Sequence, residues 1–551
     1  MLLTAARAVL VRGRNTVAML MRRRDPARSD QEPAAPIRGE LLNPDQLDQR
    51  ARAIAATHTA TLRAGDVRML LAALDRNQRV IGAAHHTLSQ DTRPREITPA
   101  AEWLLDNFHI VVAQIREIRQ DLPRGYYDEL PKLTAGPLAG QPRAYAIALD
   151  LIEHTDGRLD LEQLLRFILA YQSITPLTIG ELWAVAIMLR FGLVENLARL
   201  AGIILAARAA RDAADDWANR LLAEDVGADM AHSPVLAELA QHHPDLSSAF
   251  ALRLLYRLRT YDGERDIGAL VTWLEQQPVI PYNNVEALIH AEHQRQAANQ
   301  AAIGNTITSM RTLSTIDWAD WFEQVSLVEQ VLRQDPAGAY GRSTFATRDH
   351  YRHAVEQLAR RSGASELDVA RRVVERARTA PQEGDPRGAH VGYYLVDSGR
   401  AALEAELGYH PTPAQAVQRV ILRRPTAFYL GSLAATTAAG VAVGLRLLDR
   451  GRRTKDESWL SARVEPSRSS KLPSFVFRLS YAALLTLPAS ALAKELVDRC
   501  VARILSPRVL PRLDLRDGIP AELRTMVVIP TLLLTPDSVR GQIEALEVLA
   551  L

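Results

Sequence analysis

Residues 175–201 read TPLTIGELWAVAIMLRFGLVENLARLA, and this stretch decides the fold class that the sequence predicts. Thr178 followed three residues later by Glu181 has the pattern of a capping box, in which each side chain accepts a backbone N–H from the other residue. Apolar residues then recur at spacings of three and four, which is typical of one buried face of an α-helix. They are Leu182, Ala186, Leu189, Leu193, Leu197 and Leu200. We therefore predict a long helix that begins at Thr178.

The stretch AEWLLDNFHIVVAQIREIRQDL, residues 101–122, has the same period. Thr98 and Pro99 before it suit the cap and the first position of a helix, and the sequence from Leu122 to Gly125 favours a helix end. The residues on its apolar face are Leu104, Phe108, Val111, Ile115 and Ile118. We predict one helix with a single apolar stripe here.

Ala, Leu, Arg and Glu are the dominant residues from Gly39 onward. Aromatic residues make up only 5% of the chain, and runs of β-branched residues are rare. We predict a mainly α fold, with a large helical soluble region over 37–424. A basic, flexible leader at 1–36 precedes it and includes a Pro-containing linker. No fixed repeat period is present, so a regular solenoid is not expected.

The composition excludes several classes of protein. The chain has 551 residues with 66 basic and 64 acidic side chains, and this net charge of +2 argues against a nucleic-acid partner. Its one cysteine, Cys500, excludes an intrachain disulfide and a CxxC motif. No lysine follows a glycine and no two glycines lie two apart, so the P-loop and the dinucleotide fingerprint are missing. GxSxG and HExxH are also absent.

One segment has the composition of a membrane span. Residues Pro425–Leu445 carry no charge over 21 positions, which is about 32 Å of helix and matches a hydrocarbon core of about 30 Å. Gly440 and Gly444 form a GxxxG pair that permits close approach of another membrane helix. Because the segment is Ala-rich, a buried helix of a soluble protein is the alternative interpretation.

A second apolar segment, SFVFRLSYAALLTLPASALA, contains Arg478 and Pro488. An arginine near a helix end can snorkel to the interface, and proline is tolerated in membrane helices. We therefore predict a transmembrane hairpin over 425–496, with spans at 425–448 and 474–496. Eight basic residues lie outside the hairpin and eight lie in its loop, so the positive-inside rule does not fix its orientation.

The last segment, 497–551, changes character again. Thr525–Pro530 is a short apolar, β-branched run typical of a strand, and Pro536 lies near the start of a following helix. A lone strand leaves its edges unpaired. We interpret this segment as a linker and the first strand and helix of a truncated α/β domain.

Eight segments, in order along the chain, carry a resemblance to one known family. They include ITPAAEWLLDNFH (97–109), QIREIRQDLPRGYYDELPKL (114–133), HTDGRLD (154–160), 175–190, 326–340, 344–363, 383–409 and LPRLDLRDGIPAELRTMVVIPTLL (510–533). These segments resemble the N-terminal part of bacterial cyclic β-1,2-glucan synthases, which are glycosyltransferases. The resemblance covers nearly the whole chain from about residue 37.

The resemblance implies a large enzyme of the bacterial inner membrane. In such enzymes a soluble N-terminal region and two membrane helices precede a cytoplasmic glycosyltransferase domain, and further membrane helices and a phosphorylase-like region follow. The resemblance implies that Thr525–Leu533 is the first strand of the transferase domain and that the soluble regions are cytoplasmic. It implies UDP-glucose and a divalent metal as cofactors of the full-length family, whereas we expect no cofactor in this chain.

The sequence lacks motifs that such a transferase uses. A metal-dependent sugar-nucleotide transferase holds its cation with paired carboxylates, usually DxD, and no two aspartates here lie two apart. No tryptophan follows an arginine, so a QxxRW-like acceptor motif is also absent. We expect the membrane-anchoring and scaffolding portion of a synthase, not catalytic alone. Its expected partners are the membrane, the remaining synthase segments or a glucan chain. The alternative is a stand-alone membrane-anchored helical interaction protein or a pseudogene product.

No catalytic, cofactor-binding or metal-ligating residue is predicted, but several family-like positions are candidates of unknown role. They are Trp103, Asp106, Asn107, His109, Tyr126, Tyr127, Glu181 and Trp183. The polar cluster Asp106, Asn107 and His109 could contact a glucan or the transferase domain, or form a local hydrogen-bond network. Tyr126 and Tyr127 could stack on sugar rings, or be half-buried with their hydroxyls at the surface.

Two further patterns have structural interpretations. The Asp156–Gly157 pair in HTDGRLD favours a turn that ends a helix. Trp318 and Trp321 lie one helical turn apart and are expected to anchor the core.

Overall fold

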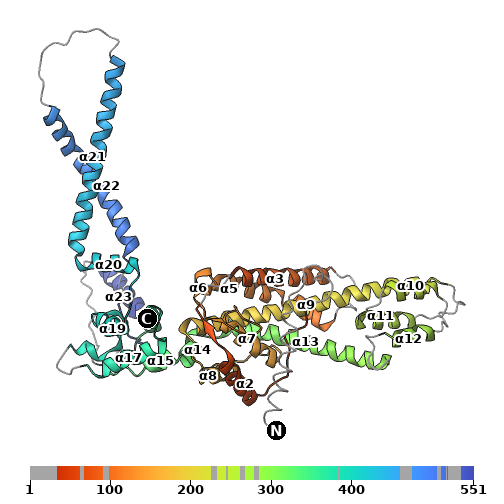
Figure 1. Ribbon diagram of the computed structural model, residues 1–551. Helices are drawn as coiled ribbons and strands as arrows, with labels where there is room; N and C mark the ends of the chain where they lie inside the picture. The colour runs from red at the N-terminus through yellow and green to blue at the C-terminus, as the bar shows by residue number, and fades with distance from the viewer. Residues whose placement is uncertain are drawn as a thin grey trace. The chain divides into compact units, whose positions relative to one another are not determined.

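A computed structural model describes residues 34–550 apart from 63–66, 91–97, 225–232, 243–245, 261–266, 278–283, 381–384, 460–473, 506–509, 517, 519–520 and 522–534. The described chain is almost entirely α-helical (Figure 1), which confirms the predicted mainly α fold class. It divides into two compact units. Unit 1 holds the residues up to Leu332 together with Ser365–Arg371, and unit 2 holds Arg333–Ala364 and the residues from Arg372.

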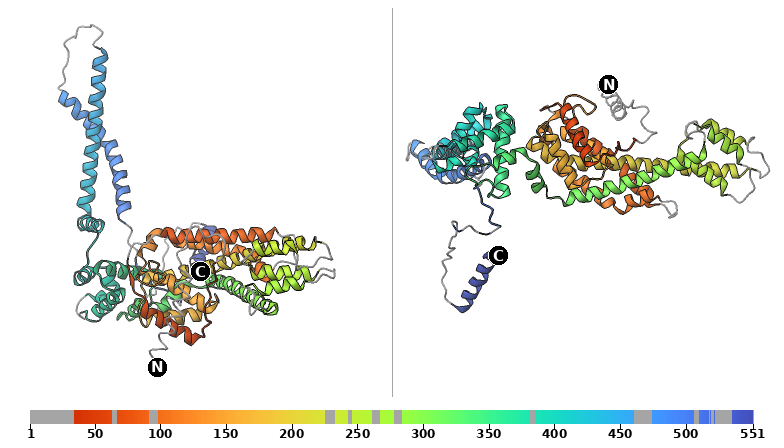
Figure 2. Two further views of the ribbon diagram at one scale, coloured as in Figure 1. Left: turned by 45° about the vertical axis from the view of Figure 1, so that its right-hand side comes forward. Right: turned by 90° about the horizontal axis from the view of Figure 1, so that it is seen from below.

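Unit 1 is organised around two long helices that pack against each other, α9 (Ile179–Leu222) and α13 (Val285–Thr315) (Figures 1 and 2). A short antiparallel pair joins β1 (Ala60–Thr61) to β2 (Lys132–Leu133). The remaining helices of this unit are α2 (Pro44–Thr57), α3 (Val67–Ser89), α4 (Pro99–Asp106), α5 (Phe108–Asp121), α6 (Arg124–Glu129), α7 (Arg143–Thr155), α8 (Leu161–Gln172), α10 (Pro234–His242), α11 (Ser248–Arg259), α12 (Gly268–Glu275), α14 (Trp318–Val325) and α15 (Leu327–Leu332).

The start of α9 confirms the predicted capping box. The Thr178 side chain accepts from the Glu181 backbone N–H, and the Glu181 side chain accepts from the Thr178 backbone N–H. All six predicted apolar residues are buried, and α7, α3 and α13 pack against the helix. The N-terminal half of α9 is therefore enclosed by protein, as its leucine spacing predicts.

The C-terminal half of α9 belongs to a second cluster of buried residues. Trp217 and Leu221 of this half pack with Phe250 and Leu254 of α11 and with Leu270 of α12. A single helix thus runs through both cores of unit 1.

The predicted single helix over 98–122 is wrong, because the structure breaks it at Asn107 into α4 and α5. The Asn107 side-chain amide donates to the Trp103 carbonyl oxygen at 2.9 Å, the same carbonyl that accepts the Asn107 backbone N–H at 3.3 Å. Asparagine side chains compete with the backbone in this way and end helices. The predicted cap residue Thr98 and the end at Leu122 are both present.

Both structural interpretations in unit 1 agree with the structure. Asp156 has φ of 50°, in the left-handed region, and ends α7 together with Gly157 at φ of 73°. Trp321 is 2% exposed and makes an edge contact with the ring of Trp318 at 5.3 Å.

Unit 2 begins with a small helical body and continues into two long helices (Figure 1). The body contains α16 (Phe345–Ser362), most of α17 (Glu366–Arg378), the 3-10 turn η5 (Pro386–Ala389), α18 (Val391–Val396), α19 (Arg400–Leu407) and α20 (Pro413–Arg423). The long helices are α21 (Pro425–Trp459) and α22 (Ser474–Ile504), which pack extensively against each other. We call this pair the hairpin.

Within the described residues, one helix segment is long and apolar enough to cross a membrane, namely Pro425–Leu447 of α21. Within the same residues, no part of α22, which holds the second predicted span, meets that description. The prediction of two transmembrane helices is therefore not confirmed. α21 also continues as a helix through Trp459, into the region predicted as a loop.

The C-terminal helix predicted from Pro536 is present as α23 (Pro536–Ala550). The predicted strand Thr525–Leu533 and most of the predicted leader at 1–36 lie outside the described residues. The predicted boundaries at 424, 496 and 497 stay predictions.

Candidate functional site

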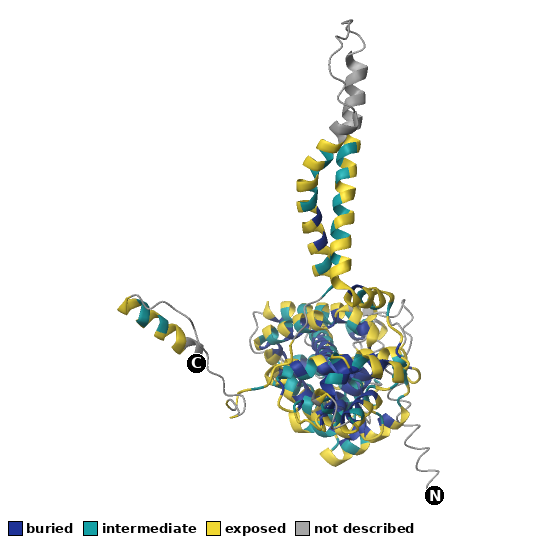
Figure 3. Ribbon diagram, turned by 90° about the vertical axis from the view of Figure 1, so that its left-hand side faces the viewer, coloured by how far each residue is buried: buried dark blue, intermediate teal, exposed yellow. Residues whose placement is uncertain are grey.

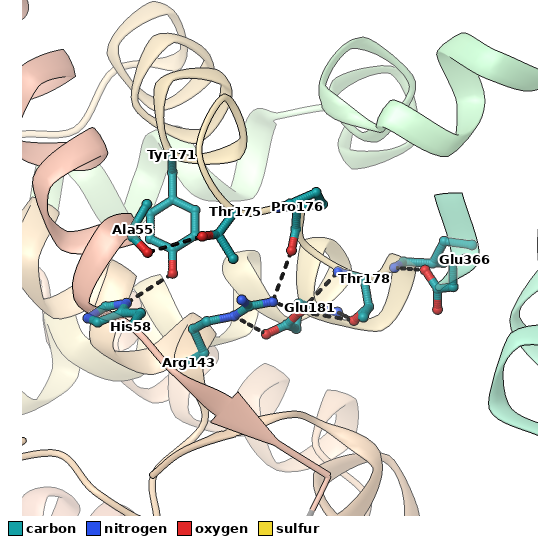
Figure 4. Close-up of polar contacts among 10 residues, drawn as sticks. Ala55, His58, Arg143, Tyr171, Thr175, Pro176, Thr178, Glu181 and Glu366 are labelled. Carbon is teal, nitrogen blue, oxygen red and sulfur yellow. Dashed lines mark hydrogen bonds and ion pairs between the residues drawn. The ribbon is translucent and has the colours of Figure 1, made fainter. Parts of the chain in front are cut away.

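The candidate residue Glu181 lies in the first turn of α9 and pairs with Arg143 of α7 (Figure 4). Arg143 donates through Nε to Glu181 Oε1 at 2.7 Å and through Nη2 to Oε2 at 2.5 Å. The Glu181 side chain is fully buried and that of Arg143 is 8% exposed. Two parallel charge-assisted hydrogen bonds of this kind fix the geometry as well as the charge.

Neighbouring groups form further hydrogen bonds with this buried pair and with the start of α9. Arg143 Nη2 also donates to the Pro176 carbonyl oxygen at 3.1 Å, and the Thr178 hydroxyl donates to Glu181 Oε2 at 3.1 Å. The Ile179 backbone N–H donates to Glu366 Oε2 at 2.7 Å, as Figure 4 shows. Buried charges require such partners, since an unpaired one is costly. The start of α9 is thus a polar joint that fastens three segments of unit 1.

The directions in which the protein shifts the pKa values of these groups favour the same structural role. Burial opposes the charged form of Arg143, but the hydrogen bonds and charge of Glu181 outweigh it and raise the Arg143 pKa. Beside the pair, His58 Nδ1 lies 3.0 Å from the Tyr171 hydroxyl oxygen (Figure 4). Burial lowers the pKa of His58 and raises that of Tyr171, so both neutral forms are favoured. These shifts suit packing rather than proton transfer.

Three aromatic candidates also have structural positions in unit 1. The Tyr126 hydroxyl donates to the Gly180 carbonyl oxygen at 2.7 Å, so the structure brings it beside Glu181. Trp183 stacks on Phe322 with ring centroids 4.9 Å apart. Tyr127 is 1% exposed and lies under the Lys132 ammonium, 4.7 Å from the ring centroid. Of these three, the buried Tyr127 ring cannot serve as a surface platform for a sugar.

The other candidates lie where α4 meets α5. Asn107 is buried, and its side-chain oxygen accepts from Arg311 of α13. Trp103, Asp106 and His109 are exposed. Asn107 therefore ties the helix break to α13. The exposed three remain available to a partner.

The expectation that this chain carries no cofactor stays a prediction. Among the described residues, no group of three or more His, Cys, Asp or Glu side chains could hold a metal ion. The sequence also lacks the paired aspartates that grip the cation on a sugar nucleotide. We therefore derive no catalytic step through UDP-glucose or a metal.

A polar cluster in unit 2 was missed by sequence reasoning. Asp335 Oδ2 accepts from Tyr340 N at 3.0 Å and His390 Nδ1 at 2.8 Å, while its Oδ1 accepts from Val391 N at 3.0 Å. Burial alone would raise the Asp335 pKa, but these hydrogen bonds lower it. The sequence signal was the Asp335–Pro336 turn, whose partners lie 55 residues further along the chain.

That cluster also includes the ring of Tyr351 and lies close to Gly392. Tyr351 is 1% exposed, and its hydroxyl lies 3.3 Å from His390 Nε2. A Cβ on Gly392 would lie 2.6 Å from both of these atoms, so only glycine fits there. We conclude that the cluster joins α16 to α18.

The hairpin, in contrast, is largely exposed over its described part, which is mostly yellow in Figure 3. None of the most apolar stretch of Pro425–Leu447 is buried inside the protein. Large exposed apolar residues, 54–78% accessible, lie on both helices: Leu430, Val443, Leu447, Leu479, Leu484, Leu487, Leu492 and Leu496. A contiguous apolar surface of this kind marks a membrane or protein contact.

The two helices of the hairpin meet at the predicted GxxxG pair. A Cβ on Gly440 would lie 3.2 Å from Ala489 Cβ, and one on Gly444 would lie 2.8 Å from Leu485 Cδ1. At the base of the hairpin, the Tyr429 hydroxyl donates to Asp498 Oδ1 at 2.8 Å. The glycines thus permit the close helix approach that the sequence predicts.

The chain that leaves the hairpin returns to the body of unit 2. We call residues 510–516 the return segment. The Thr344 backbone N–H donates to the Arg512 carbonyl oxygen at 2.9 Å, and Arg512 N–H donates to the Thr347 hydroxyl at 2.9 Å. Asp514 N–H donates to the Arg342 carbonyl oxygen at 2.7 Å, beside an antiparallel bridge between Ser343 and Leu513. Both ends of the hairpin are therefore fastened to one body.

Comparison with known proteins confirms the resemblance seen in the sequence. Over 460 residues the chain is 34% identical to cyclic beta-(1,2)-glucan synthase NdvB of Rhizobium meliloti (strain 1021). The match covers 82% of this chain, which spans about 15% of the length of that curated relative. No family model matches the chain. The chain is thus related to a glucan synthase, over a small part of that protein.

Proposed function

We propose that this chain is the membrane-anchoring and scaffolding portion of a cyclic β-1,2-glucan synthase and is not catalytic alone. The observation that carries the proposal is the hairpin, whose apolar side chains face outward while its glycines hold the two helices together. In water such a surface would be unfavourable at about 25 cal/mol per Å² of apolar area. A lipid surround removes that cost, and we propose that both α21 and α22 cross the membrane.

The scaffolding part of the proposal rests on the return segment. Because Arg512 and Asp514 bond to residues 342–347, the two ends of the hairpin lie on the same side of any membrane that it crosses. The chain after Asp514 therefore continues from the face that carries the helical body. We propose that this body positions the following transferase segment, and that this side is the cytoplasmic face of the bacterial inner membrane.

The anchor is tested by fractionation of the tagged full chain expressed in bacteria. We expect the chain to stay in the membrane pellet after an alkaline carbonate wash, and detergent to release it. Recovery of most of the chain in the soluble fraction would overturn the anchoring role. Labelling of Cys500, which is exposed near the base of the hairpin, by a membrane-impermeant maleimide in intact spheroplasts would contradict the cytoplasmic orientation.

The absence of catalysis is tested with the purified chain, UDP-glucose and magnesium. We expect no transfer of glucose, because the carboxylate pair for the cation is missing. Addition of the remaining synthase segments should then yield glucan only when the present chain is also added. Transfer by the chain alone, abolished by a carboxylate substitution, would refute the scaffolding proposal.

A further inference from the structure

We infer that α20, the short helix before the hairpin, lies in the membrane interface and binds the anionic headgroups of phospholipids. This inference rests on the proposed insertion of the hairpin and names the partner of a second surface. α20 ends at Arg423, and α21 begins at Pro425, so the helix sits where a membrane-spanning α21 would enter the bilayer.

One side of α20 is occupied by the body of unit 2. Ile421 is buried, Arg419 pairs with Glu404 of α19 at 2.8 Å, and the Tyr409 hydroxyl donates to Gln415 Oε1 at 2.8 Å. At 3.6 residues per turn these three contacts fall within one half of the helix circumference. That half contacts protein through these residues, although Leu422, which shares it, is 48% exposed.

The other half of α20 is exposed and, apart from Arg423 at its end, apolar. Val417 is 58% exposed and Val420 is 68% exposed, and Pro413 and Ala416 share their side of the helix by spacing. A soluble helix places polar residues on its outward face. α20 instead turns valines outward, as interfacial helices do when they lie with one face in the headgroup region.

The charged residues of α20 and of the link to α21 are all basic. Arg423 and Arg424 are exposed at the end of α20, and no acidic residue occurs between Leu407 and Leu448. Basic residues beside a membrane helix attract anionic lipid by about 1 kcal/mol each. The continuity of α20 with the hairpin and the basic residues at its end therefore both favour a lipid surface as the partner of the exposed face.

The test uses the full chain in which Cys500, the one natural cysteine, is replaced by serine. New single cysteines, Val420→Cys, Leu422→Cys or Leu484→Cys, carry an environment-sensitive fluorophore, and the protein is reconstituted into vesicles. Leu422 is the matched control, because it lies two residues from Val420 and thus about 200° around the helix. Leu484, on the hairpin, reports hairpin insertion separately.

We expect brominated acyl chains to quench the probe at residues 420 and 484 but not at 422 when the vesicles contain phosphatidylglycerol. Replacing Arg423 and Arg424 with glutamine should lower the ratio of inserted to uninserted α20 roughly fivefold per arginine. In vesicles of phosphatidylcholine alone, quenching at residue 420 should fall while that at 484 persists.

The possible failures are distinguishable. Quenching at residue 484 without quenching at 420 overturns the inference about α20 and leaves the anchor intact. Absence of quenching at both positions overturns the anchor as well. A probe at 420 that is shielded from aqueous iodide but not quenched by brominated lipid reveals a protein occupant, and equal quenching in neutral and anionic vesicles refutes recognition of anionic headgroups. Both results overturn the inference.

Discussion

α9 and α21 are both long helices rich in alanine and leucine, yet only α9 buries its apolar side chains against other parts of the protein. The N-terminal half of α9 is buried by α7, α3 and α13 and also buries Glu181, Arg190 and Asn196. The apolar stretch of α21 has no charged residue and buries none of its most apolar part in protein. The comparison teaches that paired charges, more than hydrophobicity, separate a protein-enclosed helix from one suited to lipid.

The strongest test of the comparison is to break the buried ion pair of α9. Arg143→Met leaves Glu181 buried without its partner, and we expect a loss of about 3–5 kcal/mol of unfolding free energy. Urea unfolding of the purified chain in detergent, followed by tryptophan fluorescence, measures it. Arg119→Ala, which breaks an exposed pair with Asp75, is the control and should cost at most about 1 kcal/mol. Equal losses for both variants would contradict the role of burial.

The second test compares leucines of the two helices. Leu193→Ala in α9 removes a fully buried side chain and should cost about 2–5 kcal/mol. Leu484→Ala in the hairpin removes one that is 73% exposed and should change stability by no more than about 0.5 kcal/mol. The same urea titration serves for both. A large loss from Leu484→Ala would mean that residues of this chain, rather than detergent, cover Leu484.

The third test concerns the contact inside the hairpin. Gly440→Leu inserts a side chain where Ala489 Cβ lies within 3.2 Å of the added Cβ, and overpacking should cost about 1–3 kcal/mol. Denaturation in mixed SDS micelles measures the effect. Gly431→Leu is the matched control, since nothing lies within 4 Å of a Cβ there. If both variants behave alike, the GxxxG pair does not hold α21 to α22.

The smallest expected effect is a pH dependence confined to unit 1. Because burial lowers the pKa of His58 below 6.5, the folded state binds its proton less readily than the unfolded state. Stability should be full above about pH 6.5 and decline as the pH falls towards the lowered pKa. His58→Gln should flatten this decline in thermal unfolding scans between pH 7 and pH 5. An unchanged slope would show that another group controls it.

Local features of the molecule were predictable from the sequence. The capping box at Thr178, the Asp156–Gly157 helix end and the GxxxG pair each depend on residues within four positions of one another. The break at Asn107 is equally local, but the prediction missed it. The prediction relied on the regular spacing of apolar residues and gave too little weight to the tendency of an asparagine side chain to bond the backbone.

Long-range partners were not predictable in this way. Glu181 is recognisable as a cap, but its pairing with Arg143, 38 residues away, depends on how α7 packs on α9. Asp335 and His390 lie 55 residues apart, and nothing in their spacing joins them. The exposure of Val417 and Val420 likewise appears only once the body has covered the other half of α20.

The return segment also sets an order of assembly. Arg512 bonds to Thr347 across 165 positions of sequence, so the ribosome must make both hairpin helices before the base of the hairpin can close. Contacts of such large sequence separation carry a loop-closure cost that slows their formation. Until then the start of α16 lacks this partner, so this contact of the body forms only after both hairpin helices have been made.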